Sequence, residues 1–560
     1  MNLEKIADKV VETDVLVIGG GIAGCPAAAK AAEHGLHVTL AEKAKTDRSG
    51  SAAAGIDHFP GFFRRGLTPK EFAEVCEGYG PGAFFGGYVY SDRTRLFRAY
   101  AAGEWGVEEL EKLGVTMRWD GELRWMDAEQ HWKGPTLRVH WQNVKPEMAA
   151  GVRKRGVNVL ERTMIIDLLT NNGNISGATA VNTRTGEFIL IIAKAVVIAT
   201  ADCSRIYDHE TPMPWKFKFR YHTCPSSVCG DGWAMAYRAG AEVANMEQSG
   251  GGYRFRDDLA LSYGNIGNEG FEGRTITWDG VEQPSYGIMD RVKLEQMGKE
   301  PLYVTLEDLP DDFKKRIEVA YVDERMVSFK VSEDRGFDFR THRFELMGNR
   351  PFQLKHAPGI NANADLMTTI NGLYAIGDCV QGSHAVASAT TMGFLVGDTV
   401  GEFVKTMNEP VIDEAQVESH KELIETLKAV KDGTEPLELE SAIRYANHRY
   451  IGLLRSEGKL NEGLRRLSSL KREFLLNLQA DNPHHLMRAL EVRNIMEVSL
   501  LHIQASLERT ETRSEFIRLD HPEENPEWDG KLSYQMLEDG KAVFKMRERP
   551  ELDMDYKEER

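Results

Sequence analysis

Short apolar runs that end in glycine or other small residues mark the expected strands of this chain. Four such runs lie at 14–18, 37–41, 194–200 and 372–378. Runs rich in β-branched residues are typical of parallel strands buried on both faces. A helical stretch at 25–34 separates the first two runs and ends at Gly35, a suitable C-terminal cap. This alternation predicts an α/β fold.

Two other patterns complete the expected elements. Residues 185–192 alternate in polarity and follow the turn sequence 171–174, which predicts a β-meander, and a helix is expected at 233–239. From about residue 412 the spacing becomes helical, and a new helix begins at Asn482-Pro483. Its core-facing positions and those of the preceding helix are Leu464, Leu467, Leu470, Phe474, Leu475, Leu478, Leu486, Leu490, Ile495, Ser499 and Ile503.

Three glycines directly after the first strand carry the first chemical signal. Gly19, Gly21 and Gly24 occupy the G-x-G-x-x-G positions between a strand and a helix. In this motif the first glycine allows a tight turn, the second admits a pyrophosphate, and the third lets helix and strand pack closely. Glu42 ends the second strand, 18 residues after Gly24, where an acid binds a ribose hydroxyl. The segment therefore predicts a dinucleotide site.

The glycine motif alone leaves FAD and NAD open, although Glu42 disfavours a 2′-phosphorylated cofactor. The later runs decide for FAD, because 194–200 ends in Ala-Thr and 372–378 ends in Gly377-Asp378. This triplet of strands resembles the flavoproteins with two dinucleotide-binding folds. In that group the late Asp reaches the ribityl chain of the flavin. Ala201-Asp202 stands where the group usually has glycines.

The predicted fold class is α/β, with a discontinuous, Rossmann-like FAD-binding domain, an inserted α+β capping domain and a C-terminal helical domain. We expect the FAD-binding domain at 1–240 and 358–410. The interruption at 241–357 is rich in Gly, acidic residues and aromatics. It is either a cap over the flavin or a plain surface insertion. The helical domain is expected at 411–510, and 511–560 is a polar, acidic tail that wraps a surface.

Composition excludes several classes of protein. A hydrophobic content of 42% in 560 residues supports a large core and excludes global disorder. Lys and Arg total 69 against 86 Asp and Glu, a net charge of -17, and no dense basic stripe is present, so nucleic-acid binding is not expected. The six cysteines form no C-x-x-C, so neither an iron–sulfur motif nor a metal site is expected.

The sequence also bears on location. The first residues lack the apolar stretch of a signal peptide, and the longest apolar run, 188–201, contains Lys194. We expect a cytoplasmic protein that meets a membrane complex only through partners.

The chain resembles the flavoprotein subunits of succinate dehydrogenase and fumarate reductase, and most of all the alpha subunit of dissimilatory adenylylsulfate reductase. The segments that carry this resemblance are 19–24, 48–55, 182–200, 230–242, 367–379 and 485–513. Succinate-type members attach FAD to a histidine where this chain has Gly50. The resemblance therefore implies non-covalent FAD, with His58 as the nearest alternative attachment site.

Motif and resemblance together assign a set of cofactor-binding residues. They are Gly19, Gly21, Ile22, Ala23, Gly24, Glu42, Lys43, Ser49, Gly50, Ser51, Gly55, Ile166, Ala199, Thr200, Asp231, Gly377, Asp378, Ser388 and Thr391. Residues 388–393 are expected to open a helix whose N-terminus faces the pyrimidine end of the flavin, where its partial positive charge stabilises the anionic reduced form.

The candidate catalytic residues are Arg254, Arg256 and His384. Arg254 and Arg256 match an aromatic–basic stretch of the family's cap, and the planar fork of arginine suits a carboxylate or a sulfate. Alternatively, both pair with Asp257 or Asp258 on a strand face. His384 matches a family histidine that donates a proton or stabilises charge, although a structural loop histidine remains the alternative.

Two departures from adenylylsulfate reductase concern the substrate. The asparagine that follows its RSG segment is absent here, and only Arg291 is available for its second substrate arginine. We therefore expect adenylylsulfate to be a poor substrate and a smaller anion to fit.

The sequence leaves three candidate functions open. The first is a redox subunit that acts on a small anionic substrate and passes electrons to a ferredoxin-like iron–sulfur subunit. The second is a C=C reductase or dehydrogenase of the fumarate/succinate type, and the third is an electron-transfer module without a small substrate. Arg509 and Arg513 form an R-x-E-x-R pattern, expected on one helix face either near a partner or in solvent.

Overall fold

The computed structural model describes most of the chain. The described residues are 5–53, 56, 58–59, 66–77, 86–126, 136–139, 143–207, 225, 227–251, 274–283, 288–308, 310–311, 334, 336, 338, 341–345, 351–354, 356–382 and 385–557. The predicted residues Gly55, Arg254, Arg256 and His384 lie outside this set.

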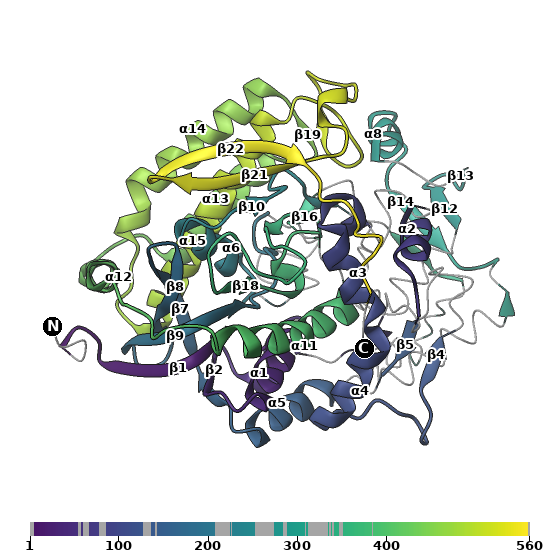
Figure 1. Cartoon of the computed structure of the whole chain (residues 1–560). Coiled ribbons are helices and arrows are strands. Elements are labelled where there is room, and N and C mark those ends of the chain that lie inside the picture. The colour runs from purple at the N-terminus through teal and green to yellow at the C-terminus, as the bar shows by residue number, and fades with distance from the viewer. Residues whose placement is uncertain are drawn as a thin grey trace.

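A seven-stranded sheet forms the centre of the molecule (Figure 1). Its strands are β1 (Lys9–Ile18), β2 (Val38–Glu42), β6 (Asn158–Glu161), β7 (Thr163–Asn171), β8 (Asn174–Asn182), β9 (Phe188–Ile198) and β18 (Leu373–Ala375). The order is β6-β2-β1-β9-β8-β7, and β18 also pairs with β9. The pairs β2–β6, β1–β2, β1–β9 and β9–β18 are parallel, whereas β7, β8 and β9 form the expected antiparallel meander.

Strand β9 is long enough to pair with two strands along the same edge. Its residues 188–192 pair with β8, and its residues 196–198 pair with β18. On its other edge, residues 189–193 pair with 9–13, so β1 begins earlier than the apolar run at 14–18 suggests. Ile18 and Ala375 are both in register with Ile198. The loops that follow three distant strands therefore meet at one end of the sheet.

Helices cover this sheet, and α1, α4, α5 and α11 gather along its lower side in Figure 1. The helices before residue 410 are α1 (Gly24–Glu33), α2 (Pro69–Glu77), α3 (Arg93–Ala101), α4 (Gly103–Leu113), α5 (Val144–Lys154), α6 (Asp231–Arg238), α8 (Ile288–Gln296) and α11 (Ala385–Val404), with short 3-10 turns η2 (Thr46–Arg48), η3 (Gly86–Tyr90) and η7 (Gly377–Cys379). A Cβ on Gly393 would lie 2.3 Å from the Ala23 oxygen, so α11 packs against α1 at backbone distance.

The expected helical region is present. It comprises α12 (Glu414–Ala429), α13 (Pro436–Tyr450), α14 (Glu457–Phe474), η8 (Leu475–Asn477) and α15 (Pro483–Glu508). Asn482 caps α15 by accepting bonds from the amides of His484 and His485. Most of the predicted core positions are buried, and they pack against side chains of β7 such as Met164 and Ile166.

The expected helical placement of Arg509 and Arg513 is wrong. Helix α15 ends at Glu508, and Arg509 is already extended. The two arginines converge instead on Glu511, whose carboxylate lies 2.7 Å from Arg509 Nη2 and 2.9 Å from Arg513 Nη2. Because Glu511 and Arg509 are buried, local ion pairing outweighs continuation of the helix.

The segment 511–560, expected as a wrapping tail, contains regular structure. Its elements are β20 (Ile517–Arg518), η9 (Pro526–Trp528), β21 (Lys531–Glu538) and β22 (Lys541–Glu548). Strand β20 pairs with β19 (Leu454–Arg455), and β21 pairs with β10 (Val243–Ala244), which also pairs with β17 (Gly359–Ile360). Leu532 and Tyr534 are buried, so the hairpin is part of the core.

Three small sheets complete the described structure, one of them to the right in Figure 1. It has the order β13-β12-β14-β15, from β12 (Arg274–Thr277), β13 (Glu282–Gln283), β14 (Leu302–Thr305) and β15 (Arg343–Glu345). The others pair β11 (Gly250–Gly251) with β16 (Pro351–Gln353), and β3 (His58–Phe59) with β5 (Thr136–Arg138) and β4 (Arg124–Met126). With α8, the described part of 241–357 is therefore α+β.

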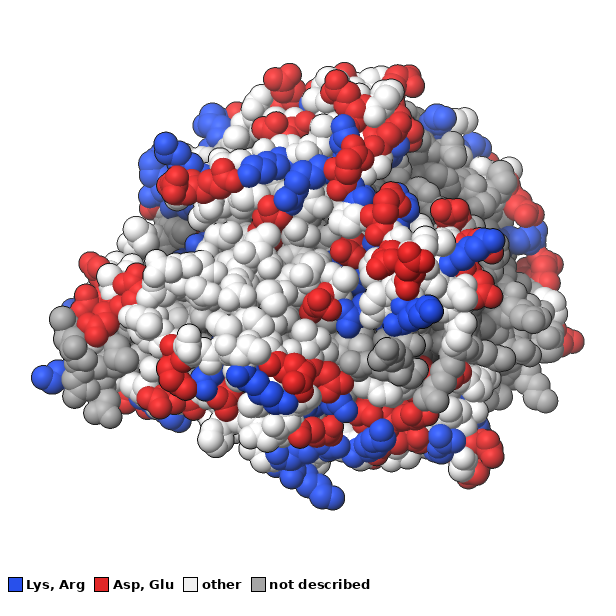
Figure 2. Space-filling view, in the orientation of Figure 1, with Lys and Arg blue, Asp and Glu red and all other residues white. Residues whose placement is uncertain are grey.

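Acidic and basic side chains are interspersed on the face drawn in Figure 2. A broad uncharged area separates the charges along β22 from those near α11. Within the described ranges, no helix is long and apolar enough to cross a membrane.

Candidate functional site

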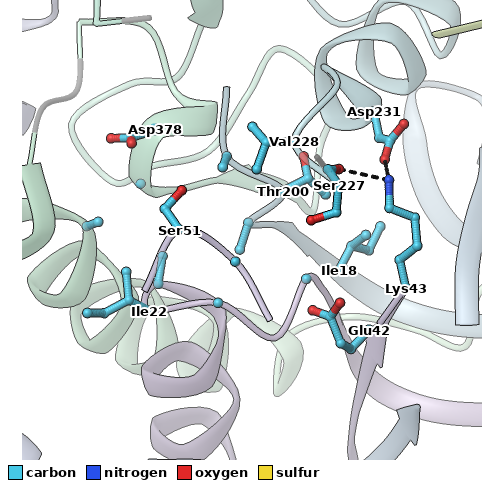
Figure 3. A pocket seen from close by; sticks show the side chains of 18 of the residues that line it. Ile18, Ile22, Glu42, Lys43, Ser51, Thr200, Ser227, Val228, Asp231 and Asp378 are labelled. Carbon is cyan, nitrogen blue, oxygen red and sulfur yellow. Dashed lines mark hydrogen bonds and ion pairs between the residues drawn. The ribbon is translucent and has the colours of Figure 1, made fainter. Parts of the chain in front are cut away.

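An elongated cavity lies where the ends of β1, β9 and β18 meet (Figure 3). Most of the predicted cofactor residues line it, namely Gly19, Gly21, Ile22, Ala23, Glu42, Lys43, Gly50, Ser51, Ala199, Thr200, Asp231, Gly377 and Asp378. Figure 3 shows Glu42 and Lys43 towards one end and Asp378 at the other. The position outside the carboxyl ends of parallel strands is the usual one for a nucleotide ligand.

The glycine loop has the geometry that its motif predicts. Gly19 has φ +102°, and a Cβ there would lie 2.5 Å from the Ala199 oxygen. A Cβ on Gly24 would lie 1.9 Å from the Gly19 oxygen, so this glycine permits close packing of α1. By contrast, a Cβ on Gly21 would meet nothing within 4 Å. Gly21 therefore presents bare backbone to open space, as a pyrophosphate site requires.

Glu42 orients the loop as well as lining the cavity. Its two carboxylate oxygens each accept a backbone N–H at 2.7 Å, one from Gly20 and one from Ala44. Each oxygen keeps a further lone pair, so the carboxylate can also accept a hydroxyl donor. This arrangement fits the predicted ribose contact.

Lys43 lines the cavity, but its ammonium is committed elsewhere. It donates to the Ser227 oxygen at 2.9 Å, Asp231 Oδ2 at 2.7 Å and Glu491 Oε1 at 2.7 Å. Burial alone would lower the pKa of Lys43, yet the facing carboxylates hold that pKa well above its usual value. Lys43 and Asp231 therefore shape this end of the cavity as an ion pair that also ties it to α15.

Tight backbone turns form other parts of the cavity wall. Gly377 has φ +64°, and a Cβ there would lie 3.0 Å from the Ala23 Cβ. Gly50 has φ +74°, and its Cβ would lie 3.3 Å from the Gly21 Cα. Ala201, where the resembling family usually has glycine, also has a left-handed φ of +62°. The turn thus keeps the glycine conformation with alanine, at a cost in strain.

Several predicted residues lie beside the cavity rather than in it. Ile166 packs against the helical region, and the neighbouring residues Thr163, Met164 and Ile165 line the cavity in its place. Ser388 and Thr391 are buried in α11, and Ala389 and Val386 of the same helix line the wall. Ser49 and Gly24 support the loop without lining the cavity, and Ser49 Oγ lies 3.2 Å from the Gly20 oxygen.

Sequence reasoning missed a group of mainly apolar wall residues. They are Ile18, Ala41, Ala52, Ile56, Thr163, Met164, Ile165, Ala201, Ser227, Val228, Met235, Ile376, Val386 and Ala389. Ile18, Ala41 and Ile376 flank the strand ends already recognised, so their positions were a usable signal. Ala52, Ala201, Met235 and Ala389 lie in the segments 48–55, 201–202, 230–242 and 388–393 already singled out, and the other wall residues carry no motif.

The residues present fit FAD. An acid, a bare glycine loop and a Gly-Asp turn follow one another along a single elongated cavity, as adenosine, pyrophosphate and flavin do in the cofactor. Among the described residues, no group of three or more His, Cys, Asp or Glu side chains is placed to hold a metal ion.

Comparison with known families agrees with this site. The model described as "FAD binding domain" matches residues 14–57 and 91–249, and the model described as "Fumarate reductase flavoprotein C-term" matches residues 440–555. The chain therefore carries both the FAD-binding domain and the C-terminal domain of the fumarate reductase flavoproteins. The second match spans α13 to the hairpin β21–β22, so helices and hairpin form one family-specific unit of this flavoprotein.

Curated relatives of the flavoprotein are similar over nearly their whole length. One subunit of the fumarate reductase (CoM/CoB) of Methanothermobacter marburgensis is 23% identical, covering 93% of this chain and 96% of the relative. An L-aspartate oxidase of Yersinia pestis is 22% identical, covering 92% and 97%. An FAD-dependent oxidoreductase of Methanocaldococcus jannaschii is 23% identical, covering 93% and 96%. The protein is an FAD-dependent oxidoreductase.

Solved structures share the fold. Adenylylsulfate reductase of Archaeoglobus fulgidus superposes with a TM-score of 0.81 at 23% identity, covering 98% of this chain and 97% of that chain. Quinol fumarate reductase FrdA of E. coli gives a TM-score of 0.75 at 19% identity, with 97% of both chains covered. At these identities the likeness concerns the fold, so it does not choose between their substrates.

Proposed function

We propose that this flavoprotein transfers two electrons between FAD and a small carboxylate substrate. The observation that carries the proposal is the cavity, whose lining residues suit a dinucleotide cofactor. The Gly377-Asp378 turn lines this cavity, and His384 follows Asp378 by six residues in the sequence. Two of the relatives are named for fumarate and aspartate, which are both four-carbon dicarboxylates. A dicarboxylate needs fixed cationic donors, and this chain offers Arg254 and Arg256 three and five residues after β11.

The proposed roles follow from the chemistry of the side chains. FAD, when bound, supplies hydride transfer at the flavin ring. Arg254 holds a substrate carboxylate through the two parallel N–H groups of its guanidinium, and Arg256 provides a second positive charge. His384 donates or accepts the accompanying proton, since its ordinary pKa lies near neutral pH.

Adenylylsulfate is the substrate that we propose the site rejects. The family asparagine has no counterpart in this sequence, and only Arg291 is available for the second substrate arginine. Each lost hydrogen bond to a charged group costs about 1.5–3 kcal/mol, so two losses would lower turnover by several orders of magnitude. The alternative of a module without a small substrate does not account for two closely spaced arginines in the inserted segment.

An iron–sulfur partner is part of the proposal. The chain has no C-x-x-C, so it offers no site for a cluster that could carry single electrons onward. Two relatives are themselves named as subunits. Gentle purification from the native host should recover the chain with a second, iron-containing polypeptide. Recovery of a fully active lone chain would contradict this part.

The substrate class is tested by following the flavin absorbance without oxygen. Dithionite-reduced protein is mixed with fumarate, and oxidised protein is mixed with succinate, L-aspartate, or AMP plus sulfite. Oxidation or reduction of the flavin by at least one carboxylate, with no response to AMP plus sulfite, supports the proposal. Rapid reduction by AMP plus sulfite alone would overturn it.

A further inference from the structure

A fully buried lysine lies directly behind the glycine loop. Lys145, in the first turn of α5, has no exposed surface, and its ammonium donates to the Gly20 oxygen and lies 3.7 Å from Cys25 Sγ. Ser49 Oγ is 3.2 Å from the same carbonyl oxygen. The Gly20 carbonyl is therefore held from the side away from the cavity, and Gly20 is absent from the cavity wall while Gly19 and Gly21 line it.

The orientation of this carbonyl determines where the next amide points. In a trans peptide the C=O of Gly20 and the N–H of Gly21 are antiparallel. Because Lys145 draws the carbonyl inward, the Gly21 N–H is directed towards the cavity. Glu42 reinforces this orientation by accepting the Gly20 N–H at 2.7 Å. Two charged side chains thus hold the backbone at Gly20: Glu42 binds the N–H of the Gly19–Gly20 peptide, and Lys145 binds the C=O of the Gly20–Gly21 peptide, whose N–H faces the cavity.

The charge of Lys145 adds to the effect. No carboxylate of the described residues forms an ion pair with its ammonium, although burying an unpaired cation is costly. An anion on the far side of the Gly20–Gly21 peptide would compensate that cost. A cofactor diphosphate at the bare backbone of Gly21 meets this requirement.

We propose that Lys145 is a positioning residue for the diphosphate of the cofactor. It sets the direction of the Gly21 N–H and supplies a buried positive charge behind the loop. This role concerns cofactor binding and is independent of the substrate.

The test compares ligands with and without the diphosphate. FAD, ADP and adenosine are titrated separately into the apoproteins of wild type, Lys145→Met and Lys145→Gln. We expect Lys145→Met to lower the affinity for FAD and for ADP about ten- to a hundredfold, the effect of losing one charged hydrogen bond. The affinity for adenosine should not change. Lys145→Gln keeps a donor without the charge and should lie between Lys145→Met and wild type.

A matched control distinguishes this role from a loss of stability. Lys459 also donates to a backbone oxygen, that of Leu454 at 2.8 Å, but lies in α14 away from the cavity. Lys459→Met should bind all three ligands as wild type does. Unchanged FAD and ADP affinities in both Lys145 variants would overturn the proposal. An equal loss for adenosine would also overturn it, because it would indicate general distortion. If Lys145→Met does not fold, the comparison of ADP with adenosine in Lys145→Gln decides.

Discussion

At the scale of single residues, the site depends on side chains that orient backbone groups. Glu42 accepts two backbone amides, and the Lys43 ammonium donates to protein acceptors at Ser227, Asp231 and Glu491. The ligand-facing surface of the loop is consequently backbone. Such a surface binds a pyrophosphate because its N–H groups point towards the phosphate oxygens and because the helix dipole favours negative charge.

Glu42→Gln tests this description. Glutamine offers one acceptor oxygen and an NH₂ group, so one of the two buried amides would lose its partner. We expect the apoprotein to lose about 1–3 kcal/mol of unfolding free energy and FAD affinity to fall roughly tenfold. Thermal unfolding and fluorescence titration measure the two effects. Glu12→Gln, at an exposed position of β1, should change neither, and wild-type behaviour of Glu42→Gln would refute the assigned role.

At this scale, the sequence predicted contacts within one contiguous segment correctly and missed contacts between distant segments. The motif at Gly19, Gly21 and Gly24 could be predicted because strand, loop and helix are contiguous. Ile166 was wrongly assigned to the cavity: Thr163, Met164 and Ile165 line it, whereas Ile166 packs only against the helical region, beyond a register irregularity between Ile165 and Asp167. Lys145 could not be found, because its contact with Gly20 joins segments 125 residues apart and follows no motif.

At the scale of elements, α15 connects the helical region to the FAD-binding sheet. Near its start, Glu491 accepts from Lys43 and Arg205 at 2.7 Å each. Burial alone would raise the pKa of Glu491, but Lys43 and the arginines around it lower that pKa to about 2. Near its end, His502 binds the Met246 oxygen and Tyr207 Oη at 2.6 Å each. Periodicity predicted the helix but not these partners.

His502 predicts a pH dependence of stability. Burial, reinforced by Arg455, lowers the pKa of His502 to about 3 in the folded protein, against about 6.5 when unfolded. The unfolded state therefore takes up the proton first, and this contribution to stability is lost as pH falls from about 6.5 towards 3. Wild type should lose about 2 kcal/mol more than His502→Gln between pH 7 and pH 5. Equal losses in denaturant titrations would contradict the prediction.

Arg509 predicts a large effect on stability. Its guanidinium pairs with Glu247 and Glu511 at 2.7 Å each and lies 4.5 Å from the ring centroid of Trp528. Arg509→Met would leave two buried carboxylates without this cation and should cost about 3–5 kcal/mol in chemical denaturation. The control is Arg465→Met, which removes only an exposed pair with Glu462 and should leave the midpoint unchanged. A similar midpoint for both variants would contradict the buried role.

Sequence reasoning failed at this junction for an energetic reason. The i, i+4 spacing of Arg509 and Arg513 fits a helix, yet an extended Arg509 reaches buried Glu247 from a distant strand region. In β21 the apolar residues Leu532, Tyr534 and Met536 alternate with Ser533 and Gln535, a strand pattern, but the polar composition of the surrounding segment obscured it. Long-range pairing therefore outweighed local propensity.

At the scale of the whole molecule, residues from six separated parts of the chain enclose one cavity: 18–23, 41–56, 163–165, 199–201, 227–235 and 376–389. FAD should therefore stabilise the entire fold by mass action. It should also be released intact, because Gly50 provides no attachment atom and its φ of +74° disfavours a side chain. After acid denaturation and separation, the yellow colour is expected in the small-molecule fraction. Colour that stays on the polypeptide would contradict non-covalent binding.

The central claim is that FAD in this cavity exchanges two electrons with a carboxylate held by Arg254. The direct measurement is single-turnover flavin oxidation or reduction by the carboxylate that responds best, in wild type, Arg254→Ala and Arg274→Ala. Because Arg254→Ala loses a charged bidentate contact, its reaction should be about ten- to a hundredfold slower, with an unchanged flavin spectrum. Arg274→Ala, the control, removes an exposed arginine and should react at the wild-type rate. Equal rates in wild type and Arg254→Ala would contradict the account.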